Sequence, residues 1–542
     1  MIKRSLLAAT IAGIGSQAVV AAPFMPMDAR GLAMGNTGVA SAQRAHAPAY
    51  NPSLLSQAHE NDDFALLIPQ IGVNLADEEG LVDDANDIID EIVPEFERLF
   101  ENGSAFNNDI NTLSTSASDL SDAITDLQKA IADNNVLQIR NSATQAALSN
   151  TKLKQSLGSV NNQINDVNTV TEELNKSLDA ISGSPLRGRL GVGAALAFPG
   201  KKFAAALSAN ADVNFSGRAL FSDQDQNLIT AYGTEAGKLV GEASDASQQL
   251  DQVLIDITDN PLDPSLYSKV VPILNQVNNV ANYTSDDPVE TAAGNILLFK
   301  NGQLSDEAEN PDLNSQVQIK AIAVAEVALS ISREFEFFGE KVAIGLTPKL
   351  QQIETFHFVT EIDNDEDIDA DAVEESRVSY NKANIDIGLS YRFGGEDKWI
   401  LGLVGKNLIG EEFDVAEADV KGSKNNVTLS GGTIALNPQY RAGLAYGGDW
   451  VTVAADLDLV DNDPIAFEKA TQYAAIGAEL DAFDTVQFRA GYRTNLKGSN
   501  DEMVSLGAGL SPFGVHLDLA VMVNPNDPEK EAAVALETGF YF

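Results

Sequence analysis

Apolar and polar residues alternate along most of the chain after residue 62. In residues 451–460 one parity holds valine, alanine and leucine, whereas the other holds mainly threonine, alanine and aspartate. Residues 384–393 and 515–523 repeat this pattern. A period of two predicts strands with one apolar face. A soluble antiparallel sheet shows the same period, so the alternation alone does not separate it from a membrane barrel.

The number of strands and the lengths of their connections favour the barrel. The connections after the even-numbered strands are tight turns, for example at 199–201 and 447–449, whereas those after the odd-numbered strands are mostly longer. This asymmetry is typical of outer-membrane β-barrels, with long loops outside the cell and tight turns in the periplasm. We therefore predict an all-β transmembrane β-barrel of about 14 antiparallel strands, with both termini in the periplasm. The strands are expected near 62–75, 186–199, 201–216, 316–334, 339–360, 377–393, 397–408, 436–447, 449–460, 470–481, 484–494, 502–511, 514–524 and 531–542.

The last predicted strand ends on an aromatic residue. Val534, Leu536, Thr538, Phe540 and Phe542 share one parity. This segment resembles the terminal strand that the outer-membrane insertion machinery recognises. A soluble sandwich that ends in phenylalanine by chance is the alternative, and the asymmetry of the loops argues against it.

Two of the long loops, residues 77–185 and 217–315, show a helical period. In the first loop, apolar residues step by three and four over 110–131 and again over 153–181. This spacing predicts an antiparallel helical hairpin over 108–182, with a heptad seam in its second helix. The second loop has weaker patterns of the same kind. A lid, a ligand groove, a partner-docking stalk and a self-packed loop without a ligand all fit such helices.

Composition excludes several classes of protein. The 542 residues include 79 acidic and 35 basic side chains, for a net charge of −44 and no basic sub-region, which excludes nucleic-acid binding. The absence of cysteine excludes disulfides, thiol catalysis and a lipoprotein anchor. Residues 77–185, 217–315 and 361–375 carry net charges of −14, −12 and −9. Solvation of exposed loops is the favoured interpretation, and divalent-cation binding near anionic lipopolysaccharide is the alternative.

The first residues are typical of an export signal. Lys3 and Arg4 precede an apolar stretch over 5–20, and small residues follow it. This pattern predicts cleavage after Ala21. An uncleaved anchor is the alternative, although the apolar stretch is short and lacks a stop-transfer flank.

Residues 22–60 are too short for a domain and too rich in small residues for a solvated tail. They contain RGLAMGNTGVA at 30–40 and AYNPSLL at 49–55. These stretches resemble the N-terminal hatch of the FadL-type fatty-acid and hydrocarbon channels, whose pattern is an arginine, a Met-Gly-rich stretch and Asn-Pro-Ala. Here Ser53 stands in place of the alanine. The resemblance implies a lumen plug whose characteristic residues are Arg30, Gly31, Met34, Gly35, Gly38, Asn51 and Pro52.

Further stretches are similar to a relative of that fold, the outer-membrane family catalogued as conjugal transfer protein TraF. They are 62–69 leading into 81–84, 403–408, and 488–493 with 510–513. The resemblance covers both ends of the mature chain but not the helical loops, and it implies a barrel in the outer membrane of a Gram-negative bacterium. The thioredoxin-like TraF of the F plasmid shares the name, but a chain without cysteine cannot perform its thiol chemistry. The predicted domains are a signal peptide at 1–21, an N-terminal plug at 22–60, and the barrel at 61–542 with helical insertions at 77–185 and 217–315.

Enzyme motifs are absent from the sequence. It contains no Gly-x-Ser-x-Gly elbow, His-Glu-x-x-His motif or phosphate-binding loop, so we expect neither an enzyme nor a cofactor. The four histidines are His46, His59, His357 and His516. His357 lies on the inward parity beside the acidic loop, where barrel proteases and lipases keep their sites. A solvated histidine in the lumen is the favoured interpretation.

One acidic segment has the spacing of a calcium loop. Asp363, Asp365, Asp367, Asp369 and Glu374 occupy positions 1, 3, 5, 7 and 12 of an EF-hand-like register. However, isoleucine stands where that loop needs glycine, and no flanking helices are predicted. The pattern indicates an acidic loop, with calcium binding as the alternative.

Two functions fit these observations. The first is a passive channel or binder for small hydrophobic molecules, with the plug as its gate. The second is a surface-exposed interaction protein whose helical loops bind a protein partner during conjugative plasmid transfer or envelope assembly. An apolar pocket in the lumen would favour the first, and an open apolar stripe on the helices would favour the second. The expected partners are outer-membrane lipid, a hydrophobic small molecule in the first case and a protein in the second.

Overall fold

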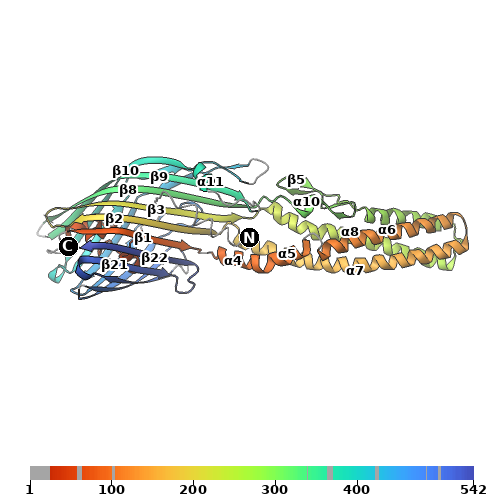
Figure 1. Cartoon of the computed structure of the whole chain (residues 1–542), viewed down its shortest axis with the longest axis horizontal. Helices are drawn as coiled ribbons and strands as arrows, with labels where there is room; N and C mark the ends of the chain where they lie inside the picture. The colour runs from red at the N-terminus through yellow and green to blue at the C-terminus, as the bar shows by residue number, and fades with distance from the viewer. Residues whose placement is uncertain are drawn as a thin grey trace.

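In the computed structural model, fourteen antiparallel strands close into a barrel, and a bundle of helices extends from one end of it (Figure 1). The structure describes residues 25–57, 64–77, 79–100, 104–337, 340–362, 370–421, 427–483, 485–498 and 502–541. The predicted signal peptide, His59 and Phe542 lie outside these ranges. In order around the ring, the strands are β1 (Ala65–Ala76), β2 (Pro185–Phe198), β3 (Ala204–Leu220), β8 (Gln316–Phe337), β9 (Glu340–Glu361), β10 (Val378–Phe393), β11 (Trp399–Lys406), β16 (Gln439–Gly447), β17 (Val451–Asp458), β18 (Tyr473–Ala482), β19 (Val486–Asn495), β20 (Glu502–Leu510), β21 (Val515–Val523) and β22 (Glu531–Tyr541).

The alternation in the sequence separates the outer face of the wall from the inner face. In β21, Val515, Leu517 and Leu519 are 44% to 53% exposed, whereas His516 and Asp518 are at most 4% exposed. Apolar side chains therefore cover the outside and polar ones line the inside, as lipid-facing barrels require. All fourteen predicted strands are present, and β1 pairs with β22 to close the ring. The predicted fold class is confirmed.

Aromatic side chains project at the end of the barrel that carries the tight turns. Phe203, Trp450, Phe483 and Phe513 lie in or beside these turns, and each is at least 64% exposed. Exposed aromatic residues are enriched where a barrel meets the boundary between lipid and water. They therefore give this end the character of a membrane interface.

Four long helices form the bundle. α6 (Ala105–Ala132) and α7 (Val136–Ile181) belong to the β1–β2 connection, and α8 (Asp223–Asp259) and α9 (Leu266–Ala281) belong to the β3–β8 connection. α6 contacts α7 and α9, and α8 also contacts α7 and α9, so the four helices surround one core. The helical hairpin predicted over 108–182 is present, but the second loop completes its core. This four-helix bundle is called the stalk below.

Hydrogen-bonded caps fix where the stalk helices begin. The side chains of Ser104, Asn135 and Ser222 each accept a hydrogen bond from the backbone N–H three residues later. Such caps satisfy backbone groups that the first turn of a helix leaves unpaired. At 1.5 Å per residue, the 46 residues of α7 span about 69 Å. Within the described residues, no helix is both long enough and apolar enough to span a membrane.

The base of the stalk packs directly onto the barrel. Leu178 and Ile181 at the end of α7 form an apolar cluster with Leu186 of β2 and with Phe221, which precedes α8.

The remaining elements are short. They are α2 (Ala29–Ala33), η1 (Arg44–His46), α3 (Ala47–Tyr50), η2 (Pro52–Gln57), α4 (Leu81–Asp87), η3 (Ile88–Ile92), α5 (Val93–Phe100), β4 (Val289–Thr291), β5 (Gly294–Ile296), β6 (Phe299–Lys300), β7 (Gln303–Leu304), α10 (Asp306–Glu309), α11 (Ala370–Glu375), η4 (Gly395–Asp397), β12 (Glu411–Asp414), β13 (Ala418–Asp419), β14 (Thr428–Leu429), β15 (Thr433–Leu436) and η5 (Pro512–Gly514).

Thr171 is one of several polar side chains buried in the stalk. Thr171 is buried in α7, and its hydroxyl has no hydrogen-bond partner among the described residues. The substitution Thr171→Val replaces this hydroxyl by a methyl group of similar shape. It is expected to raise the free energy of unfolding of the stalk by about 1 kcal/mol, measured by thermal loss of helical circular dichroism. Thr169→Val is the control, because the Thr169 hydroxyl is exposed and donates to the carbonyl oxygen of Asn165. A similar gain in both variants would contradict this explanation.

Candidate functional site

Residues 25–57, called the plug segment, lie inside the barrel. Arg30 pairs with Glu479 on β18, and Ser56 hydrogen-bonds Ser332 on β8. These two strands lie on nearly opposite sides of the ring. Because the partners are inward-facing groups of different walls, the segment crosses the lumen. Side chains and short helices hold it there, and no strand of the segment joins the barrel ladder.

The glycines of the plug segment allow its backbone to approach the wall and itself closely. Gly35 has φ near +72°, and a Cβ there would lie 2.8 Å from the carbonyl oxygen of Tyr492 on β19. A Cβ at Gly38 would lie 2.1 Å from the ring of Tyr50. The backbone N–H of Gly38 donates to Asp456 at 2.8 Å. Larger residues would therefore push this stretch away from the inner wall.

The Asn-Pro-Ser sequence binds the opposite part of the wall. The Asn51 amide donates to the carbonyl oxygens of Val39 (2.9 Å) and Leu389 (3.1 Å). It thus joins two parts of the plug segment to β10. The Ser53 hydroxyl donates to Asn51 Oδ1 (2.7 Å) and also hydrogen-bonds the Ser390 hydroxyl (2.9 Å), which can donate to it. Serine in place of the alanine of the FadL pattern therefore adds a hydrogen bond to the wall.

All seven sequence-predicted plug residues lie in this segment and are buried. Met34 packs in an apolar cluster with Ala445 and Ala454 of the wall. Gly31 lies against Tyr50, and a Cβ on Gly388 would meet the side chains of Asn51 and Pro52. The structure therefore brings these residues together at contacts between the plug segment and the barrel.

Arg30 begins a chain of buried ion pairs. Its guanidinium group makes two hydrogen bonds to the Glu479 carboxylate, both 3.0 Å long. Arg489 donates to the same carboxylate at 2.6 Å and also to Asp518, which pairs with His516. Bidentate pairs between arginine and a carboxylate are strong and directional. This chain fixes the plug segment to three neighbouring regions of the wall.

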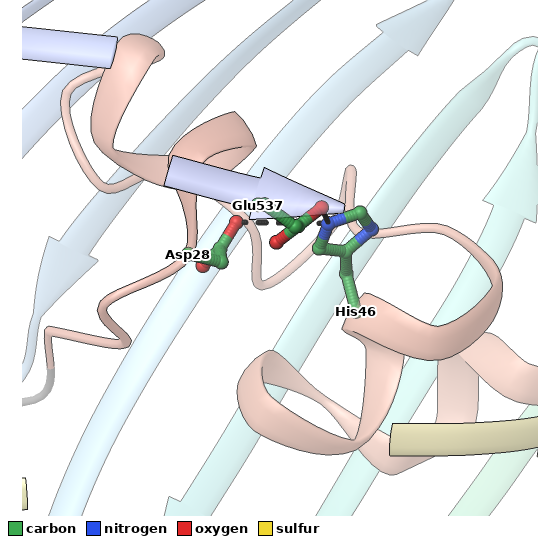
Figure 2. A group of neighbouring side chains, drawn as sticks. All are labelled: Asp28, His46 and Glu537. Carbon is green, nitrogen blue, oxygen red and sulfur yellow. Dashed lines mark hydrogen bonds and ion pairs between the residues drawn. The ribbon is translucent and has the colours of Figure 1, made fainter. Parts of the chain in front are cut away.

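A second group of buried ionisable residues lies beside that chain (Figure 2). His46 Nε2 is 2.7 Å from Glu537 Oε1 on β22 and 3.9 Å from Asp28 Oδ2. All three side chains are at most 3% exposed. Burial alone would lower the pKa of His46, but the carboxylates of Glu537 and Asp28 raise it above its usual value. The three residues join two separate turns of the plug segment to the last strand of the barrel.

A cavity of about 100 Å³ separates part of the plug segment from the wall. Inside it, Lys349 pairs with Glu326 at 3.2 Å, and Arg189 pairs with Asp212 at 3.1 Å. The Lys406 ammonium group donates to the carbonyl oxygen of Ala49. The lining is therefore polar and charged, unlike the mostly apolar lining of typical small-molecule sites.

A second closure lies at the end of the lumen nearest the stalk. The β11–β16 connection folds inward, and its described residues 411–421 and 427–436 are called the mouth cap below. Phe413 and Ile434 of the cap pack against Ile322 and Ile353 on the inner wall. The Thr355 hydroxyl donates to the carbonyl oxygen of Asp414 at 2.8 Å. Folded segments therefore occupy the lumen at two levels.

The mouth cap also changes the interpretation of His357. This side chain is 2% exposed, and its Nδ1 lies 3.1 Å from the carbonyl oxygen of Ala416 in the cap. The expectation of a solvated histidine was wrong, because the sequence pattern gave no sign that the cap folds over this part of the wall.

The candidate calcium loop is only partly described. Asp363, Asp365, Asp367 and Asp369 lie outside the described residues. Glu374 is exposed in α11, where it pairs with Arg377 at 2.7 Å. Calcium binding at this loop therefore stays a prediction.

Sequence reasoning missed the charged contacts of the plug segment. Their wall residues, Glu479, Arg489, Asp518 and Glu537, occur at inward positions of predicted strands. An ionisable residue on the inward parity of a strand is a signal that can be read from the sequence. The partners Asp28 and His46 give no such signal, because an irregular segment has no period.

Comparisons with solved structures give weak likenesses across nearly the whole chain. The toluene transporter TbuX of Ralstonia pickettii matches with a TM-score of 0.42 and 10% identity, over 96% of this chain and 99% of that one. The toluene transporter TodX of P. putida matches with a TM-score of 0.39 and 10% identity, over 96% and 99%. The CymD monoaromatic hydrocarbon channel matches with a TM-score of 0.39 and 11% identity over the same shares. No curated protein sequence matches significantly.

The sequence itself identifies the family. The model of the family described as "F plasmid transfer operon, TraF, protein" matches residues 48–153 and 115–458. These matches include the last ten residues of the plug segment, the stalk and the mouth cap. Because they cover well over half of the chain, the protein belongs to the family described as F plasmid transfer operon, TraF, protein.

Proposed function

We propose that the protein is an interaction protein of the Gram-negative outer membrane, which presents its stalk outside the cell to a protein partner in plasmid transfer or envelope assembly. One observation carries this proposal: folded segments occupy the barrel lumen at two levels, whereas a four-helix bundle with helices up to about 69 Å long projects beyond it (Figure 1). A barrel whose lumen is occupied in this way serves such a role as an anchor.

The surface of the barrel supports a membrane position. Its outer parity is apolar, as in β21, and aromatic residues project at the tight-turn end. We propose that outer-membrane lipid surrounds this apolar outer face. The plug segment then seals the lumen, the barrel anchors the protein in the membrane, and the helical insertions form the stalk.

The surface of the stalk supports a protein partner. Leu137 and Leu148 are 71% and 56% exposed, and their spacing of 11 residues places them on one face of α7. Ile255 and Tyr267, near the end of the stalk that is remote from the barrel, are also exposed. Single exposed apolar residues are normal on protein surfaces, so the charge of the stalk carries more weight. Since the two loops are strongly acidic, we propose a partner with a basic surface.

An epitope tag inserted between Asn134 and Asn135, at the α6–α7 turn, tests this proposal. We expect antibody labelling on intact cells, because a wall strand that starts in the periplasm places the β1–β2 connection outside. The control tag lies between Lys201 and Lys202 in the tight β2–β3 turn, and it should be labelled only after permeabilisation. Labelling of the stalk tag only after permeabilisation would invert the topology and remove the case for a surface role.

A passive channel or binder for small hydrophobic molecules is the second candidate. The favouring observation is that the plug segment is bound by side chains and turns rather than by strand pairing, so it can move while the wall stays closed. The charged lining of the lumen cavity weighs against an apolar ligand. Conductance measurements on barrels without the plug segment test this candidate.

We propose a non-catalytic role in either case. The surroundings of the described histidines support this view. His46 and His516 pair with carboxylates at the plug–wall contacts, and the backbone of the mouth cap contacts His357.

A further inference from the structure

We propose that Asp28, His46 and Glu537 form a binding site for a divalent transition-metal ion of the zinc type, at the junction between the plug segment and β22. The three residues come from two separate turns of the plug segment and from the last strand of the barrel. Figure 2 shows their side chains next to one another, with dashed lines from His46 to the two carboxylates. This inference goes beyond the proposed function and does not depend on it.

The donor atoms are close to the spacing that such an ion requires. Bond lengths of 2.0–2.2 Å in a tetrahedral site place neighbouring donors about 3.3 Å apart. His46 Nε2 is 2.7 Å from Glu537 Oε1 and 3.9 Å from Asp28 Oδ2, and the three donor atoms all lie within 4.8 Å of one another. The two distances from His46 Nε2 thus lie about 0.6 Å on either side of the required separation. Histidine nitrogen and aspartate or glutamate oxygen are all donors that bind zinc in proteins.

Both carboxylates have the outer hydrogen bonds that orient metal ligands. The Tyr50 hydroxyl donates to Asp28 Oδ1 at 2.7 Å, and the Gln70 amide donates to Glu537 Oε2 at 2.9 Å. In each case the other oxygen faces His46. Asp28 Oδ2 also accepts from the backbone N–H of Gly31, which fixes its direction and leaves a further lone pair. Such second contacts are a regular feature of protein metal sites.

Two buried carboxylates, those of Asp28 and Glu537, face one imidazole at this place. Buried carboxylates need compensating positive charge, and a divalent ion bound between them would supply it and stabilise the contact between plug and wall.

The lumen cavity provides access and a place for a further ligand. Asp28 and Gln70 line this cavity of about 100 Å³, which has room for water molecules. Water at the cavity edge completes a site with three protein ligands. The neighbouring group of His516, Asp518 and Glu537 is a poorer candidate, because the positive Arg489 guanidinium already pairs with Asp518.

Metal content of the full-length protein in detergent tests the inference. The protein is stripped with a chelator, equilibrated with Zn²⁺, desalted and measured by mass spectrometry of the metal. We expect about one zinc ion per wild-type chain and a loss of that ion in His46→Ala and Glu537→Gln. The control His357→Ala removes a histidine held by the mouth cap and is expected to keep the ion. Heat-dependent gel mobility establishes that each variant still forms a barrel.

Cobalt substitution gives a second readout that needs no variant. Co²⁺ in a tetrahedral site with nitrogen and oxygen ligands has intense visible absorption, which we expect from the wild-type protein. Wild-type protein that retains no zinc and shows no such absorption would overturn the inference. Zinc that persists in both His46→Ala and Glu537→Gln would also overturn it, because the ion would then lie elsewhere.

Discussion

Deletion of residues 25–57 is expected to raise the single-channel conductance of the barrel in planar bilayers from a closed baseline to discrete open steps. The plug segment crosses the lumen from β8 to β18, so its removal opens the space through which ions can pass. The barrel should survive the deletion, because its strands are hydrogen-bonded to one another around the complete ring. Heat-dependent gel mobility would establish that the wall is intact.

The mouth cap provides the controls for this experiment. A variant without the cap alone should stay closed, because the plug segment still fills the lumen. A variant without both segments should conduct more than one without the plug segment alone, because the cap packs on the inner wall at Ile322 and Ile353. Equal conductance in all of these proteins would contradict the assignment of the plug segment as the seal.

Glu479→Leu is expected to loosen the plug segment and to lower the stability of the whole protein. Glu479 is a buried acceptor for both Arg30 and Arg489. Its loss would leave the Arg30 guanidinium buried without its carboxylate partner, next to a second positive charge. Breaking a buried ion pair by removing one partner costs about 3–5 kcal/mol. Thermal unfolding in detergent measures the loss of stability, and protease cleavage within 25–57 measures the release of the plug.

Two further variants distinguish the loss of this contact from general damage. Arg30→Met combined with Glu479→Leu should recover part of the stability, because the uncompensated charge is removed and Arg489 still pairs with Asp518. Asp461→Asn breaks the exposed pair with Lys497 and should have little effect. A Glu479→Leu protein as stable as the Asp461→Asn protein would show that the ion pairs do not hold the plug.

The barrel could be predicted because alternate residues of a strand face lipid and the lumen. Each strand therefore shows apolar and polar residues with a period of two. The outward positions of β21 are apolar and its inward positions include His516 and Asp518, so periodicity alone located the strand. The same logic located α6 and α7 from their apolar seams. The position of the plug segment came from the resemblance of 30–40 and 49–55 to a known hatch, since an irregular segment has no period.

Contacts between distant segments could not be predicted from one sequence. The pairing of Arg30 with Glu479 joins residues 449 positions apart, and nothing near either residue identifies the other. The mouth cap was missed because the short apolar stretch around Phe413 does not differ from an outer loop until its wall partners are known. The shared core of the stalk was missed for a similar reason, because each loop shows only its own half of the apolar surface.

The attachment of the stalk has a mechanical consequence. Its four helices leave the barrel from β1, β2, β3 and β8, which are consecutive around the ring. A sideways pull on the tip would therefore act through a lever arm of about 69 Å on one sector of the wall, rather than evenly on its rim. The same sector borders β22, which carries the Glu537 contact with the plug segment. Torque from a bound partner would thus reach the part of the wall that binds the plug segment through Glu537.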